Sequence, residues 1–357
     1  MKKIMVTAAV ILCLTTLTGC GGREIDDMAY VVAIGVDSNE KGGYSFTLAI
    51  GNPGSISGEG GDENVLILES AEGDNIFTAG EAIGTKTGQM VNFSHAELMV
   101  FSESVSLNGV DKFLDGITRN LNQRPKLVPI TAKDSAGKVI GAIHSQFEGN
   151  PEKYLKKIFE SSIVSTNIDG RRFLSRTKIL DGGVAIPRSA EYGGTITVDA
   201  MSVFDGDRAV GVFNDIFAYK LLCGEVKGIS YDLSGGGTLI LTRRKEPSIK
   251  ISCEDIPKID IFLTLSSTVA AVSADTDKAQ LRLDAGQELE KRIYDLLKYS
   301  SADVHLDFLG LYKYARGNFL TWQDWDLYNW REKYPSASFN VNVEILPEKT
   351  GLIRGEI

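Results

Sequence analysis

The amino terminus has the layout of a bacterial lipoprotein signal peptide. Lys2 and Lys3 precede an apolar stretch over residues 4–17, which has the length of a signal h-region and is too short to span a bilayer as a mature helix. The run Leu17-Thr18-Gly19-Cys20 follows. An ordinary secretory signal followed by a stray cysteine is the alternative, and the Leu-x-Gly-Cys order argues against it. We therefore expect cleavage before Cys20 and a mature chain that begins at a lipid-modified cysteine.

This anchor limits what the rest of the chain can be. One acyl chain binds a membrane only marginally, at about 0.8 kcal/mol for each buried methylene. A lipoprotein cysteine carries a diacylglyceryl group, so at least two chains hold it. The apolar segment 259–273 is interrupted by Asp260 and is short of a span. We therefore expect a water-soluble body tethered to the outer surface of the cytoplasmic membrane.

Composition and charge narrow the class of partner. Removal of residues 1–19 leaves 338 residues and lowers the formal net charge from −9 to −11. This length allows two or three domains, and the charge argues against nucleic acid or anionic lipid as a partner of the body. Processing removes Cys13 and blocks Cys20, so Cys223 and Cys253 remain. They could pair outside the cell or stay as two buried free thiols.

Several segments carry helical signals. The clearest amphipathic helix has apolar residues at i, i+3, i+4, i+7 and i+11, namely Val110, Phe113, Leu114, Ile117 and Leu121. A helix over residues 75–90 is expected with Asp74 as its N-cap, and another begins at Asn150-Pro151. We expect a further helix over residues 284–299 and a tryptophan-rich helix after it.

Alternating or continuous apolar runs predict strands around residues 28–37, 44–50, 65–69, 96–101, 195–204, 208–213, 226–233, 238–242, 248–252, 259–272 and 339–345. The fold class is therefore α+β and multi-domain, with mostly antiparallel sheets and packed helices. We expect a signal peptide over 1–19, an N-terminal α+β domain over 20–190, a small β-rich middle domain over 195–246, and a C-terminal α+β domain over 247–357.

The sequence contains no motif of a catalytic, cofactor-binding or metal-binding site. It has no G-x-S-x-G, H-E-x-x-H, Walker loop or C-x-x-C. The histidines, His95, His144 and His305, lie far apart and lack metal-ligand spacing. We therefore expect no enzymatic activity, no cofactor and no metal.

Two C-terminal groups of residues allow a functional and a structural interpretation. Acidic side chains could bind a cation or do acid–base work, but such groups are more often solvated; they are Asp303, Asp307, Asp324 and Asp326. Tryptophans at i, i+3 and i+8 could form an interaction patch, but we expect them to pack their helix onto a sheet; they are Trp322, Trp325 and Trp330.

Four segments together resemble the C subunit of spore germinant receptors, the Ger(x)C family. They are the lipobox followed by residues 23–29 and Gly35-Val36-Asp37, the run from Ser94-His95-Ala96-Glu97 to Arg119, the hairpin 200–211, and the stretch from Ala302 past Gly310 to Trp322, Trp330 and Gly351. The chain departs from the family where Gly21-Gly22 replaces a tryptophan and where Asp205 and Arg208 stand in for lysines.

The resemblance implies a three-part α+β fold and a non-enzymatic role in spore germination. Such subunits act with integral-membrane A and B subunits in the inner membrane of the spore, in a complex that responds to small nutrients. A solute-binding lipoprotein of a transporter is the alternative, although that class usually shows alternating βαβ units. A secreted hydrolase without a recognisable motif is a third hypothesis.

Overall fold

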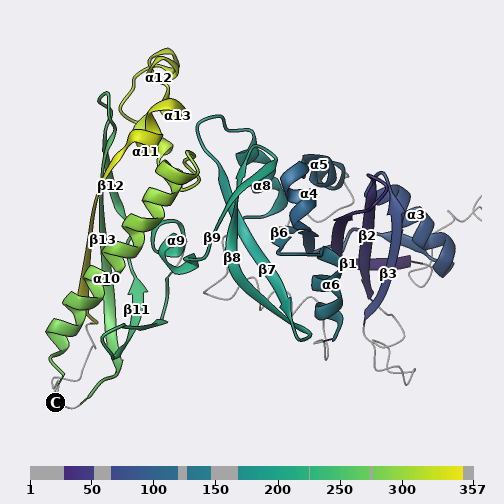
Figure 1. Ribbon diagram of the computed structural model, residues 1–357, viewed down its shortest axis with the longest axis horizontal. Helices are drawn as coiled ribbons and strands as arrows, with labels where there is room; N and C mark the ends of the chain where they lie inside the picture. Colours follow the sequence, from purple (N-terminus) through teal and green to yellow (C-terminus); the bar gives the residue numbers. More distant parts are fainter. Residues whose placement is uncertain are drawn as a thin grey trace, which may run out of the picture.

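The computed structural model describes residues 28–51, 66–119, 127–145, 168–224, 226–273 and 276–348. They form an elongated body with two sheets, one toward each end of the long axis (Figure 1). Cys20 and the helix expected at Asn150-Pro151 lie outside the described residues.

The first sheet has nine strands in the order β3-β2-β1-β5-β6-β7-β8-β9, with β4 paired to β1. The strands β1, β5, β6 and β7 are parallel neighbours, and antiparallel hairpins extend the sheet at both ends. Their bounds are β1 Met28–Ser38, β2 Tyr44–Gly51, β3 Leu66–Gly73, β4 Met90–Asn92, β5 Leu98–Phe101, β6 Val128–Ala132, β7 Val184–Tyr192, β8 Thr195–Asp205 and β9 Arg208–Phe213.

Helices cover both faces of this sheet. One buried apolar cluster joins the strands to residues of α3 (Ile76–Thr87), α5 (Asp111–Arg119) and α8 (Gly170–Thr177). A second cluster joins them to α6 (Ala136–Ser145), which lies on the opposite side from α5 in Figure 1. The short helix α4 (Glu103–Asn108) follows β5.

The Gly35-Val36-Asp37 motif fixes α6 against β1. A Cβ atom on Gly35 would lie 3.0 Å from Ile140 Cγ1 and 3.2 Å from the carbonyl carbon of Ala136, so a larger residue would push α6 or the Ile140 side chain away from β1 by a few tenths of an ångström. The Asp37 carboxylate accepts the backbone N–H groups of Ala136 and Gly137, both at 2.8 Å, and so caps the first turn of α6. The motif that supports the family resemblance therefore has a packing role.

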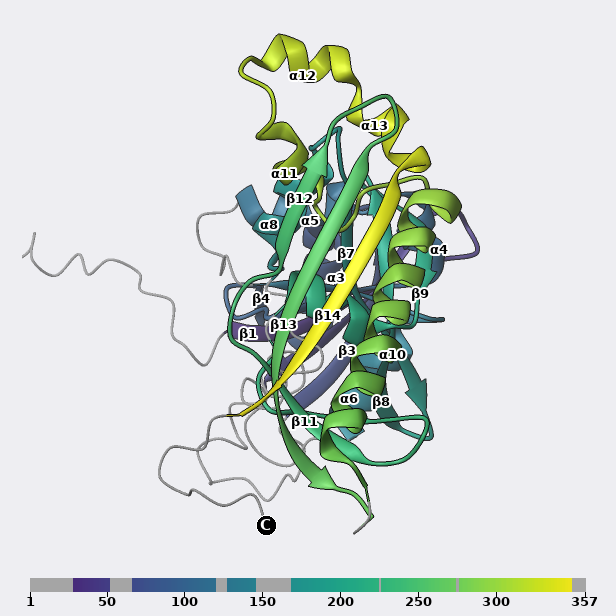
Figure 2. The same cartoon turned by 90° about the vertical axis from the view of Figure 1, so that its left-hand side faces the viewer.

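The second sheet has five strands and carries one long helix on one face. Its order is β10-β11-β13-β12, and β14 pairs in parallel with β13. Helix α10 (Lys278–Lys298) packs against β14, and Figure 2 shows the opposite face of the strands. The strands are β10 Ile229–Asp232, β11 Thr238–Arg243, β12 Ser248–Ser252, β13 Lys258–Ala271 and β14 Ser338–Pro347.

Short elements complete the C-terminal part. The π-helix Tyr299–Asp303 extends α10, and the next helices are α11 (Tyr312–Arg316), α12 (Trp322–Tyr328), α13 (Trp330–Lys333) and a 3-10 turn at Tyr334–Ser336. Among the described residues, no helix combines the length and apolar character needed to cross a membrane.

The two sheets share one apolar core. Buried residues of β7 and β8, together with Phe213, belong to the same cluster as α9 (Ile216–Cys223), α10 and the second sheet. Phe213 stacks on Phe308 with a centroid distance of 5.2 Å. The Arg292 guanidinium donates two hydrogen bonds to the Asp215 carboxylate, at 2.7 and 2.6 Å. These contacts fix the second sheet against β7–β9.

The α+β class is confirmed, with one qualification on strand direction. Among the described strands, seven pairings are antiparallel and five are parallel. Segment 195–246 contributes β8 and β9 to the first sheet and β10 and β11 to the second. The division into three domains stays a prediction, because strand pairing does not show which parts fold independently.

Candidate functional site

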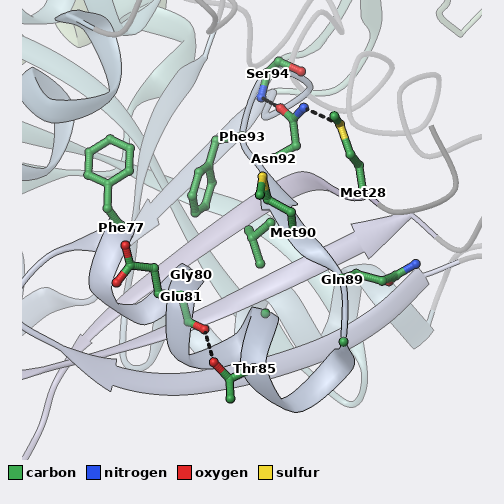
Figure 3. Close-up of a pocket in the computed structure, with 13 residues that line it drawn as sticks. Met28, Phe77, Gly80, Glu81, Thr85, Gln89, Met90, Asn92, Phe93 and Ser94 are labelled. Atoms are coloured by element: carbon green, nitrogen blue, oxygen red, sulfur yellow. Dashed lines mark hydrogen bonds between the residues drawn. The ribbon is translucent and has the colours of Figure 1, made fainter. Parts of the chain in front are cut away.

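A groove beside β1 is the main candidate for an interaction site. It has a volume of about 720 Å³ and lies between α3 and the segment that continues through β4 to Ser94 (Figure 3). Helix α3 begins at Asn75, whose side chain accepts the N–H groups of Phe77 and Thr78, and it ends at Gly88 with φ 71°. These caps set the length of the helix that forms one wall.

Two glycines let the other wall approach α3. A Cβ on Gly80 would lie 3.0 Å from the Phe93 ring, and a Cβ on Gly84 would lie 2.8 Å from the carbonyl oxygen of Gln89. Larger residues would therefore push the β4 segment away from the helix.

The lining is apolar with a few fixed polar groups. Met90 is 48% exposed at the rim, and Phe77 meets Phe93 edge-on with centroids 6.0 Å apart. The Asn92 amide lies 3.4 Å from the Met28 sulfur, which it holds in place. Glu81 is the charged residue of the lining, which holds no histidine, cysteine or lysine. Such a surface can bind an apolar group and offers no acid–base pair for catalysis.

The C-terminal Asp307 is a structural residue. Its Oδ1 accepts the N–H groups of Gly310 and Leu311 at 2.9 and 3.0 Å, and its Oδ2 accepts the N–H of Tyr312 at 2.6 Å and Nε1–H of Trp330 at 3.2 Å. Burial raises the pKa of this carboxyl to about 6, and the same hydrogen bonds oppose the shift. Asp307 therefore holds a loop and a tryptophan together.

The expectation for the tryptophans is confirmed for two of the three. Trp325 and Trp330 are buried and stacked, with centroids 6.0 Å apart. Trp325 Nε1–H donates to Asp181 at 2.9 Å, so this ring ties α12 to the segment before β7. For Trp322 the expectation is wrong, because its side chain is exposed to solvent.

The other acidic side chains have separate surroundings. The Asp324 carboxylate accepts the hydroxyl of Thr321, the N-cap of α12, at 2.7 Å. Asp205 accepts a hydrogen bond from Arg331 at 2.5 Å. The aspartate that stands here in place of the family's lysine therefore forms an ion pair. Across the described part of the chain, no three histidine, cysteine, aspartate or glutamate residues are placed to hold a metal ion.

The histidines and cysteines show no shared site. His95 meets Tyr30 edge-on at 4.9 Å, His305 has a left-handed backbone conformation with φ 56°, and His144 lies in α6. Cys223 and Cys253 are free thiols. Their sulfur atoms lie 3.5 Å from the Leu309 carbonyl and 3.7 Å from the Ala315 carbonyl.

Comparisons with known proteins give the family. Residues 21–176 match the family described as the spore germination protein N-terminal domain, and residues 199–351 match the family described as spore germination B3/GerAC like, C-terminal. The chain belongs to the Ger(x)C family. The two matches occur in order and together extend over most of the chain.

Two Ger(x)C relatives come from Bacillus subtilis (strain 168). Spore germination protein KC is 27% identical over 166 residues, which cover 44% of this chain and 41% of the relative. The putative spore germination protein YfkR is 24% identical over 233 residues, which cover 60% and 59%. The match therefore spans about two fifths of the length of spore germination protein KC and about three fifths of the length of YfkR.

A solved structure supports the Ger(x)C fold. The crystal structure of the GerBC protein matches with a TM-score of 0.56 at 16% identity, over 88% of this chain and 96% of that one. At this identity the similarity concerns the fold alone.

Sequence reasoning missed the groove of the Ger(x)C chain. The available signal was the spacing of Gly80, Gly84 and Gly88, which places small residues on one face of the helix. Helical glycines are also common without a function, so this spacing alone does not indicate a groove.

Proposed function

We propose that this chain is the lipid-anchored C subunit of a nutrient germinant receptor. It acts without catalysis, by assembly with integral-membrane A and B subunits, and spore germination requires it. The observation that carries this proposal is the ordered match of both spore germination families, over residues 21–176 and 199–351. The Leu-x-Gly-Cys run before the first match supports the anchor.

The proposed anchor gives the groove a place in the assembly. Cys20 precedes Met28 by eight residues, and eight extended residues span at most about 28 Å. A lipid on Cys20 would therefore keep the Met28 end of the groove near the inner membrane of the spore, on its outer surface. Tethering would raise the local concentration of the groove around the membrane subunits, so a modest contact area suffices for stable assembly.

Replacing Cys20 tests the anchor. We expect Cys20→Ala to move the protein from the membrane fraction of spores to the soluble fraction and to abolish the nutrient response. The reason is that this change removes the acyl chains that hold the protein on the membrane. Fractionation, mass spectrometry of the mature amino terminus and nutrient-induced germination are the measurements.

Cys223→Ser is the matched control for this experiment, because it also removes a cysteine and leaves the lipobox unchanged. It should remain in the membrane fraction and support germination. Normal membrane fractionation and germination of Cys20→Ala spores would show that the anchor is not needed and would refute the proposal.

Met90→Asp tests the groove. We expect it to reduce co-purification with co-expressed A and B subunits about tenfold, the equivalent of 1.4 kcal/mol of binding free energy, because a carboxylate at the rim disfavours an apolar partner. Membrane fractionation of the Met90→Asp variant should not change.

The control is Leu283→Asp, at an exposed position on α10, and it should bind as the wild type does. Equal binding of all three proteins would exclude the groove as a contact site.

A further inference from the structure

Three large apolar side chains of segment 320–327 are exposed to solvent: Trp322 and Leu327 lie on helix α12, and Leu320 lies just before its N-cap. Leu320 is 100% exposed, Leu327 is 83% exposed and Trp322 is 68% exposed. Figures 1 and 2 both show α12 at the outer edge of the molecule, and Figure 1 places it at the opposite end of the long axis from α3. We call these three residues the α12 knob. Several large apolar side chains exposed along one short segment are a candidate for an interaction site.

The body holds the opposite face of α12 rigidly. Trp325 is buried and bonded to Asp181, and the Tyr328 hydroxyl donates to the carbonyl of Glu254 at 3.0 Å. Thr321 caps the start of the helix, and Asn329 ends it in the left-handed conformation with φ 54°. A partner therefore meets a preformed surface, which lowers the entropic cost of binding.

The ring of Trp322 also has a fixed position. The Arg316 guanidinium lies 4.2 Å from its centroid and donates to the Phe319 carbonyl at 2.7 Å. This cation–π contact orients the indole and leaves its other face open. An oriented, exposed tryptophan is the residue type that most often dominates a protein interface.

Charge decides which partner fits the knob. At 100° per residue, Asp326 projects from the helix between Trp322 and Leu327, within the exposed sector. Insertion into a bilayer would carry this carboxylate into the lipid, which is unfavourable and worse with anionic headgroups. A symmetric contact with a second copy would bring two Asp326 side chains toward each other.

We propose that the α12 knob inserts into an apolar socket of a different protein, which places a lysine or arginine opposite Asp326. This inference rests on the proposed function for one point only, namely that the partner is a membrane subunit of the receptor. The knob and the groove beside β1 would then be two separate contact surfaces of the same chain.

The test uses the full-length protein in spores, with a photo-crosslinking amino acid in place of Leu327. We expect one cross-linked protein whose modified peptide lies beside a basic residue. Asp326→Lys or Trp322→Ala should reduce the cross-linked fraction about tenfold. The same probe in place of Leu283 is the control and should not give this product. Thermal unfolding of the two variants should match the wild type, since both side chains are exposed.

Three results would overturn the knob proposal. They are cross-links to lipid, cross-links to another copy of this chain, and a yield that does not change in the Asp326→Lys variant. A different result would contradict the proposed function and leave the knob proposal intact. In that case the knob would cross-link to a basic residue of a protein that is not a receptor subunit. Conversely, intact co-purification with A and B together with no protein cross-link from the probe at Leu327 would reject the knob alone.

Discussion

Asp307→Asn should lower the free energy of unfolding by about 2–6 kcal/mol, because it leaves two buried donors unsatisfied at about 1–3 kcal/mol each. An amide can accept at one atom only, so its NH₂ group would face either Tyr312 and Trp330 or Gly310 and Leu311. Urea unfolding at pH 7 measures the loss. For a domain whose total stability is about 5–15 kcal/mol, this is a large fraction.

The pH dependence gives an independent measurement for the same residue. The pKa of Asp307 is raised from 3.8 to about 6 in the folded chain. Its contribution to stability is therefore fully present below pH 3.8 and is lost as the pH rises through about 6. The size of the loss is about 3 kcal/mol at 1.36 kcal/mol per pKa unit. Asp307→Asn should remove this slope between pH 4 and 7.

The control for Asp307 is Trp330→Phe, which removes one donor and keeps an aromatic ring. The double variant should cost less than the sum of the single ones, because one of the two orphaned donors no longer exists. Additive losses together with an unchanged pH slope would mean that the carboxylate does not hold this loop.

Local patterns in the sequence predicted individual helices and strands correctly where these depend on the spacing of nearby apolar residues. Val110, Phe113 and Leu114 are buried on the face that their spacing indicated. The alternation in Lys258–Ala271 gives a strand with one buried face. The predicted N-cap of α3, Asp74, is one residue too early, because the Asn75 side chain accepts the N–H groups of Phe77 and Thr78. Both residue types cap helices, so the sequence alone does not distinguish between the two positions.

The pairing of distant segments could not be predicted in this way. Strands β1, β5, β6 and β7 are parallel neighbours, although up to about sixty residues separate consecutive ones. The sequence argument against a solute-binding lipoprotein rests on the absence of alternating βαβ units and on the β-rich second half of the chain, and these parallel strands remove the first of the two grounds. The family matches over 21–176 and 199–351 now carry the distinction.

The prediction that all three tryptophans are buried is wrong for Trp322 for a related reason. The spacing of Trp322, Trp325 and Trp330 predicts one continuous helix, but α12 ends at Tyr328 and Asn329 takes the left-handed conformation. Trp330 therefore begins a separate helix and reaches Asp307, whereas Trp322 faces solvent. Only the tertiary contacts of Asp307 and Asp181 distinguish the two buried rings from the exposed one.

Gly183→Ala is the second change with a large expected effect. A Cβ at this position would lie 2.5 Å from Leu306 Cδ2 and 2.6 Å from the backbone oxygen of Phe204. The Leu306 side chain could rotate away, but the Phe204 carbonyl belongs to β8 and cannot move without disturbing the sheet. We expect a loss of about 3 kcal/mol in the free energy of unfolding, at the upper end of the range for overpacking.

The location of Gly183 determines what this loss would reveal. Its N–H donates to the Asp307 carbonyl at 3.0 Å, so the clash falls where the first sheet meets the C-terminal loop. Gly141→Ala in α6 is the control, since its Cβ would meet open space and alanine should stabilise a helix interior by about 0.5–1 kcal/mol. If this contact joins the two sheets into one cooperative unit, urea unfolding of Gly183→Ala should separate into two transitions. A single transition at the wild-type midpoint would instead mean that the shared core around Phe213 and Phe308 alone joins them.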